Sequence, residues 1–146
     1  MRLVDANLLV YSYAEMMPQH ERAKAWLEEV LNGVARVGLP WSSLLAFVRL
    51  VANPRVFERP ASIPDAWHEV ERWLSCPAVW NPEPTTRHGE VLGRLLTSTS
   101  LSANQVPDAH LAAIAIEHGL IVCTTDTDFH RFPEIRVENP LKDDGR

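Results

Sequence analysis

Apolar residues along the chain fall into two kinds of segment. Short apolar runs, which are typical of buried strands, occupy residues 2–4, 35–39, 78–80 and 120–123, and residues 134–137 fit an edge strand. Between these runs, apolar residues recur with helical spacing, which predicts helices at 7–13, 20–31, 41–51, 62–74, 86–96 and 107–118. The alternation of strands and helices favours an α/β sandwich with a central, mainly parallel sheet of four to five strands.

The composition is that of one folded domain. The chain has 146 residues, of which 46% are hydrophobic and 23% are charged, with a mean hydropathy of -0.13. We place the domain at residues 1–141 and a polar tail at 142–146. No apolar run approaches the roughly 20 residues of a membrane span, and the N-terminus shows no secretory h-region. We therefore expect a cytoplasmic protein without membrane contact.

Charge and cysteine usage exclude two further classes of protein. A net charge of -5 and a pI near 5.6 argue against a protein that coats nucleic acid with positive charge. Cys76 and Cys123 lie outside any CxxC spacing, so we expect two reduced core thiols and no zinc knuckle. An acidic protein still acts on a phosphate backbone when its carboxylates surround a divalent cation.

Three aspartates are predicted to meet at one edge of the sheet. Asp5 follows the first strand, Asp126 follows the strand at 120–123, and Asp108 lies in the first turn of the helix at 107–118. In parallel sheets, ligands bind beyond the carboxyl ends of the strands. Crowded carboxylates repel unless a cation neutralises them, and Mg²⁺ or Mn²⁺ prefers oxygen ligands. The chemistry that follows is metal-assisted hydrolysis of a phosphodiester.

Each of these aspartates also has a purely local explanation. Asp108 is placed to complement a helix dipole, and Asp5 is placed for an Asx turn. Thr125 and Asp128 have the spacing of a capping box, which predicts a short helix starting at Asp126. Sequence spacing leaves both the local and the catalytic interpretation open.

The motifs LVDANLLVY (3–11), VPDAHLAAIAIEHG (106–119) and TTDTDFHRFPEIRVENPL (124–141), with Phe-Val-Arg at 47–49, resemble PIN-domain proteins of the VapC type. These are toxins of bacterial toxin–antitoxin pairs. The resemblance implies a parallel α/β/α sandwich and a Mg²⁺- or Mn²⁺-dependent endoribonuclease that cleaves cellular RNA. It matches Asp5, Asp108 and Asp126 to metal-ligating catalytic positions, and Asp128 to a fourth, more variable metal ligand.

The resemblance also implies partners and supporting residues. It implies a VapB-type antitoxin, an RNA substrate and a homodimer. It places Arg49 close to the acidic pocket as an RNA contact, although a solvated surface charge is an equal alternative. Asn7 and Thr125 adjoin the aspartates and are candidates to orient ligands or a water, with local capping as the alternative.

One departure from the family pattern keeps other functions open. Many members carry a glutamate three residues before the arginine of the middle helix, where this chain has Ala46 before Arg49. The loss of one carboxylate favours a single ion, or a scaffold that binds RNA or a partner without cleaving. Phosphotransfer on another α/β fold fits less well, because it needs a late lysine and only Lys142 follows Lys24.

Histidines and tryptophans carry simpler predictions. His110 lies two residues from Asp108, so on a helix it points about 200° away and should not share a metal with it. The six histidines form no i, i+4 ligand pair, which argues against zinc. For the five tryptophans we expect core packing first, with contact to an antitoxin or a second copy as the alternative.

Overall fold

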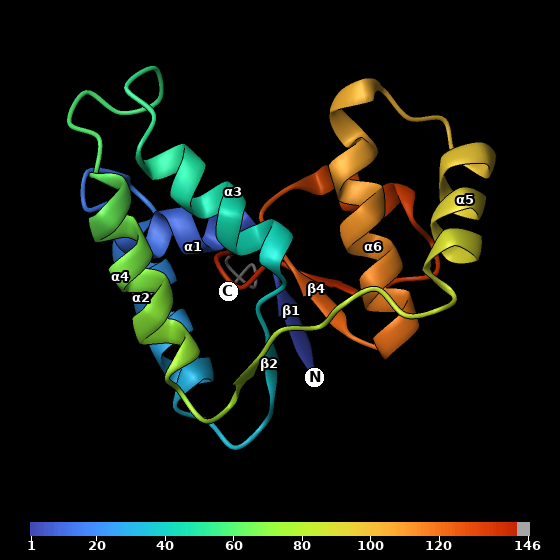
Figure 1. Ribbon diagram of the computed structural model, residues 1–146, viewed down its shortest axis with the longest axis horizontal. Helices are drawn as coiled ribbons and strands as arrows, with labels where there is room; N and C mark the ends of the chain where they lie inside the picture. The colour runs from blue at the N-terminus through green and yellow to red at the C-terminus, as the bar shows by residue number, and fades with distance from the viewer. Residues whose placement is uncertain (143–146) are drawn as a thin grey trace.

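The computed structural model describes residues 1–142 and contains a five-stranded sheet. The strands are β1 (Arg2–Val4), β2 (Val37–Gly38), β3 (Val79–Trp80), β4 (Ile121–Cys123) and β5 (Val137–Glu138). Their order is β3-β2-β1-β4-β5, and every neighbouring pair is parallel (Figure 1). The predicted parallel sheet is confirmed, and β1 occupies its centre.

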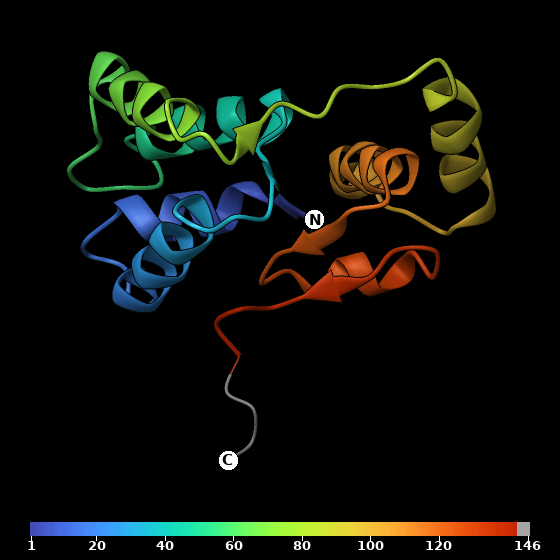
Figure 2. The same ribbon diagram turned by 90° about the horizontal axis from the view of Figure 1, so that it is seen from below.

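Helices cover both faces of this sheet. They are α1 (Ala6–Tyr13), α2 (His20–Leu31), α3 (Trp41–Val51), α4 (Ile63–Leu74), α5 (His88–Ser98) and α6 (Val106–His118). The helices α1 to α4 enclose one hydrophobic core, and α5 and α6 enclose a second core on the other side of the strands (Figure 2). This arrangement is the predicted α/β/α sandwich. Within residues 1–142, none of the helices has the length and apolarity needed to span a membrane.

Successive residues of the central strands point to opposite cores. Leu3 packs into the core of α5 and α6, whereas Val4 packs into the core of α1 to α4. The register pairs Val4 with Cys123 of β4. The residues that follow these two, Asp5 and Thr124, are therefore neighbours on the side of the sheet that α6 covers.

The structure corrects several predicted boundaries. The strand at 35–39 is reduced to Val37–Gly38, because its outer partner β3 has only two residues to pair with it. The strand at 120–123 begins one residue later, because the N–H of Leu120 closes the end of α6 by donating to Ala115 O. The edge strand predicted at 134–137 is Val137–Glu138. The helix predicted at 86–96 runs over His88–Ser98.

The tryptophans divide between the core and the surface. Trp73 is fully buried, as predicted. Trp41 of α3 and Trp67 of α4 are each 39% exposed and stack on one another, with ring centroids 6.2 Å apart and an interplanar angle of 15°. The prediction of core packing was therefore wrong for these two side chains. Helical spacing identifies an apolar face, but it does not show that these two tryptophans lie partly exposed where α3 and α4 meet.

The two cysteines are free and differ in environment. Cys123 is fully buried, and its burial raises the pKa of the thiol to about 12. Cys76 lies only partly buried at the end of α4, so the prediction of a core thiol was wrong for this residue.

These environments predict different reactivity toward a thiol reagent. Only thiolates react readily, so Cys76 should react in the native protein and Cys123 should not. Titration with Ellman's reagent at pH 8 is expected to detect one thiol per chain in buffer and both thiols in concentrated urea. The variant Cys76→Ser should show no native reaction, and a rapid reaction of that variant would contradict the burial of Cys123.

Candidate metal centre

Three carboxylates converge near the carboxyl end of β4. Asp108 comes from the first turn of α6, and Asp126 and Asp128 lie at the start of a 3₁₀ helix over Thr127–Arg131. One carboxylate oxygen from each aspartate lies within 4.8 Å of the other two, and all three residues are half-buried. An all-oxygen, anionic donor set in this geometry fits a hard divalent cation such as Mg²⁺ or Mn²⁺.

Asp5 lies beside this group of three. Its side chain caps α1 by accepting a hydrogen bond from the N–H of Ala6 at 2.8 Å. Asp5 and Asp108 line a common pocket of about 150 Å³ together with Ser42, Ser43 and Ala46 of α3. The helix predicted from residue 7 therefore starts at Ala6. The local role of Asp5 is that of a helix cap, where we considered an Asx turn, and it coexists with the place of Asp5 in the site.

A threonine that the sequence analysis missed holds the site together. The hydroxyl of Thr124 donates to Asp5 Oδ2 at 2.8 Å, and it accepts from Asn7 Nδ2 at 3.1 Å and from the N–H of Asp126 at 2.9 Å. Thr124 is 1% exposed. The first of these hydrogen bonds fixes the side chain of Asp5, which follows β1, relative to that of Thr124, which follows β4. The signal in the sequence was the strand alternation, which turns residue 124 toward the same face as Asp5.

Thr125 does not have the local role that its spacing predicts. The cap of the 3₁₀ helix is Asp126, whose Oδ1 accepts from the N–H of Asp128 at 2.9 Å. The capping box predicted for Thr125 and Asp128 was wrong, because the helix starts one residue later than that box requires. Thr125 lies half-buried next to the site.

Burial and mutual repulsion disturb the ionisation of the carboxylates. Burial, together with the negative charges of Asp126, Asp5 and Asp128, raises the pKa of Asp108 to about 7. Burial also raises the pKa of Asp5, and the charge of Asp126 adds to the rise. The site therefore concentrates negative charge that a bound cation would stabilise.

The remaining predicted residues lie around this centre. Asn7 is positioned by its hydrogen bond to Thr124. Ala46 lines the pocket that contains Asp5 and Asp108. Where many members of the family have a glutamate, this pocket has a methyl group. Arg49 is exposed one helical turn beyond Ala46 on α3.

His110 turns away from the three carboxylates, as its helical position predicts, and contacts α5 instead. Its Nδ1 lies 3.0 Å from Nε2 of His88. Sequence spacing does not reveal this pair, because the two histidines are 22 positions apart and come from different helices.

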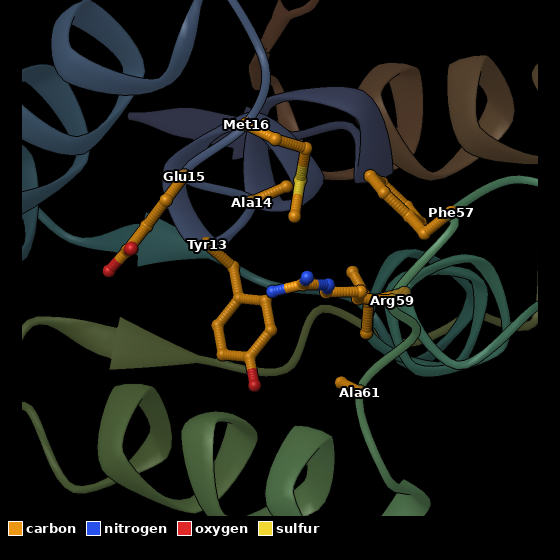
Figure 3. Close-up of a pocket in the computed structure, with 8 residues that line it drawn as sticks. Tyr13, Ala14, Glu15, Met16, Phe57, Arg59 and Ala61 are labelled. Carbon is orange, nitrogen blue, oxygen red and sulfur yellow. The ribbon is translucent and has the colours of Figure 1, made fainter.

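A second pocket lies at the end of α1. It has a volume of about 310 Å³ and is lined by Tyr13, Met16, Phe57 and Arg59 among others (Figure 3). The side chains of Tyr13, Met16 and Arg59 extend into the same space in this view, and Glu15 also lines the pocket, which therefore combines apolar surface with one basic and one acidic residue.

Comparison with known proteins identifies the family. A family model described as PIN domain matches residues 2–135. Ribonuclease VapC37 of Mycobacterium tuberculosis is 41% identical over 140 residues, which cover 96% of this chain and 97% of that protein. Ribonuclease VapC33 of the same organism is 35% identical over 143 residues, which cover 98% and 100%. The chain therefore belongs to the PIN-domain family, among its VapC members.

Solved structures agree with the fold. A crystal structure of VapBC2 from Rickettsia felis, bound to a DNA fragment from their promoter, matches with a TM-score of 0.66 at 17% identity and covers 94% of this chain and 97% of the other. FitAcB from Neisseria gonorrhoeae matches with a TM-score of 0.59 at 23% identity, and the match covers 96% and 98%. Both likenesses support the sandwich architecture.

The hydrogen bonds of Thr124 predict its contribution to stability. The substitution Thr124→Val keeps the shape but leaves three polar groups without a partner, so we expect a loss of roughly 2–4 kcal/mol in the free energy of unfolding. The neighbouring substitution Thr125→Val should change it by less than about 0.5 kcal/mol. Urea unfolding followed by circular dichroism measures both, and equal midpoints for the two variants would refute the role of Thr124.

Proposed function

We propose that this chain is the toxin of a toxin–antitoxin pair and a Mg²⁺-dependent endoribonuclease that cleaves cellular RNA in the cytoplasm. The observation that carries the proposal is the convergence of Asp108, Asp126 and Asp128 in a PIN-domain chain. Curated relatives that match nearly the full length are named ribonucleases, which supports the same activity here. Mn²⁺ is expected to substitute for Mg²⁺, because it accepts the same oxygen ligands.

The residues of the site have different roles in the proposed reaction. Asp108, Asp126 and Asp128 would hold the ion, and Asp5 adds a fourth negative charge at the adjoining pocket. A bound Mg²⁺ lowers the pKa of an attacking water and offsets the charge that develops on the phosphate. The hydroxyl of Thr124 keeps Asp5 in one orientation, which limits the reorganisation needed during the reaction. Arg49, exposed on α3, is the proposed contact for an RNA phosphate.

The proposed antitoxin has two surfaces to bind. The acidic pocket at Asp5 and Asp108 attracts a basic side chain, which would block both metal and RNA. The second pocket, around Tyr13 and Phe57, offers apolar surface for a chain segment (Figure 3). Similar folds occur in solved VapBC2 and FitAB assemblies, which supports a VapB-type partner.

Ala46 supports a second candidate function. Its methyl group lines the pocket where the family pattern often has a carboxylate. A protein with one carboxylate fewer would serve as a scaffold that binds RNA or the antitoxin without cleaving.

Induction in a bacterial host tests the proposed function directly. Wild-type protein should arrest growth and produce a few discrete new RNA 5′ ends, and the purified protein should cleave the same RNA with Mg²⁺ but not with excess EDTA. Asp108→Ala and Asp126→Ala should each lower the cleavage rate by at least about 100-fold, because each removes a ligand of the ion.

The control is Asp65→Ala, which removes an exposed carboxylate from the first turn of α4 and should leave cleavage unchanged. Cleavage that persists in both site variants would rule out the assigned ligands. If folded wild-type protein neither cleaves RNA nor binds Mn²⁺ by calorimetry, the scaffold function replaces the nuclease.

We also propose that the protein forms a homodimer through an apolar patch on α3 and α4. Beside the stacked pair Trp41 and Trp67, the patch contains Leu45 of α3 and Ile63 of α4. Each lies four positions from the tryptophan of its own helix, on the same helix face, and each is more than half exposed. Large aromatic side chains are enriched in protein interfaces.

Light scattering coupled to gel filtration tests this patch. Wild-type protein at micromolar concentration should elute as a dimer, and Trp67→Glu should elute as a monomer, because it places a charge inside the apolar contact. His68→Glu changes the next exposed position on α4 and should leave the dimer intact. A monomeric wild type, or a dimeric Trp67→Glu variant, would disprove the assignment.

A further inference from the structure

A second cluster of ionisable side chains joins α5 to α6, on the side of α6 that faces away from the carboxylates. At its base lies Glu117, whose side chain is fully buried. One of its oxygens accepts hydrogen bonds from the N–H of Thr85 at 2.9 Å and from the Thr85 hydroxyl at 2.5 Å. The other oxygen lies 2.6 Å from Nδ1 of His88. These contacts fix the carboxylate, and they hold its pKa below the usual range despite its burial.

The carboxylate determines which nitrogen of His88 carries the proton. A buried, ionised Glu117 only accepts hydrogen bonds, so Nδ1 of His88 donates to it, and in the neutral imidazole Nε2 then carries the lone pair. That lone pair is directed at Nδ1 of His110, 3.0 Å away. His110 lies seven residues before Glu117, two turns along the same face of α6, so His88 is inserted between them.

This arrangement has the features of a transition-metal site. Metal-binding histidines almost always donate their second ring N–H to a carboxylate, a backbone carbonyl or a water, and His88 donates to the carboxylate of Glu117. Two imidazole nitrogens that lie about 2.0–2.1 Å from one ion are roughly 3.0–3.4 Å apart at bond angles of about 95–110°. The observed 3.0 Å between His88 and His110 is within that range.

The two rings also contact one another through their edges. Their planes are nearly perpendicular, at 81°, and their centroids are 4.9 Å apart, so the rings meet at their nitrogen-bearing edges and do not stack. His88 is 15% exposed at its side chain and His110 is half-buried, which allows solvent to supply the remaining ligands.

We propose that His88 Nε2 and His110 Nδ1 bind a borderline divalent ion, such as Cu²⁺, Ni²⁺ or Zn²⁺, with Glu117 as the outer carboxylate. Imidazole nitrogens prefer these ions, whereas the all-oxygen group of Asp108, Asp126 and Asp128 prefers Mg²⁺. On binding, His110 carries its proton on Nε2 in place of Nδ1, so the proton count does not change. The ion cross-links α5 and α6, and the proposal does not depend on nuclease activity.

Electron paramagnetic resonance of bound Cu²⁺ tests the site, because nitrogen ligands split the copper signal and oxygen ligands do not. One equivalent of Cu²⁺ is added to the full chain in the presence of excess Mg²⁺, which occupies the carboxylates. The wild type should show the splitting of two nitrogen ligands. His88→Gln and His110→Gln should each lose that pattern and bind Cu²⁺ at least tenfold more weakly by competition with a chelating indicator.

Two further variants separate ligation from folding. Glu117→Gln keeps both histidines, so it should retain the two-nitrogen pattern while its affinity falls by roughly 10- to 100-fold. His68→Gln removes an exposed histidine of α4 and should change neither pattern nor affinity. An oxygen-only spectrum for the wild type would overturn the proposal. So would a two-nitrogen pattern that survives in either folded histidine variant.

Discussion

The pairing of β1 with β4 is the interaction on which the site depends. These strands are far apart in the sequence, and their parallel register brings Val4 beside Cys123. The next residues, Asp5 and Thr124, are then joined by a hydrogen bond of 2.8 Å. A slip of one residue would turn each side chain to the opposite core, so the buried alternation of both strands maintains the geometry of the acidic centre.

The same pairing brings negatively charged side chains close together. Four carboxylates gather at one edge of the sheet, and burial together with their repulsion raises the pKa of Asp108 to about 7. Hydrogen bonds compensate in part, since the N–H of Ala6 and the hydroxyl of Thr124 donate to Asp5, and the N–H of Asp128 donates to Asp126. A centre of this kind favours a divalent cation, because only positive charge removes the repulsion.

Helix α6 links the two clusters of ionisable groups. Its first turn carries Asp108, and its last turn carries Glu117, which holds His88 of α5. The oxygen cluster and the imidazole cluster lie on different faces of this helix, so they offer different ions separate places to bind. The middle of the helix is buried between them, with Ala109, Ala112 and Ala113 allowing close packing.

The sequence by itself determined the order of strands and helices along the chain, because hydrophobic periodicity is visible within each short segment. It also indicated the aspartates that gather at the sheet edge, because ligands bind beyond the carboxyl ends of parallel strands. Strand limits, the role of Thr124, the exposure of Trp41 and Trp67, and the pairing of His88 with His110 were decided by tertiary structure. Each depends on which elements pack together and in what register. A pattern along one segment shows which face is apolar, but it does not contain the partner that covers that face.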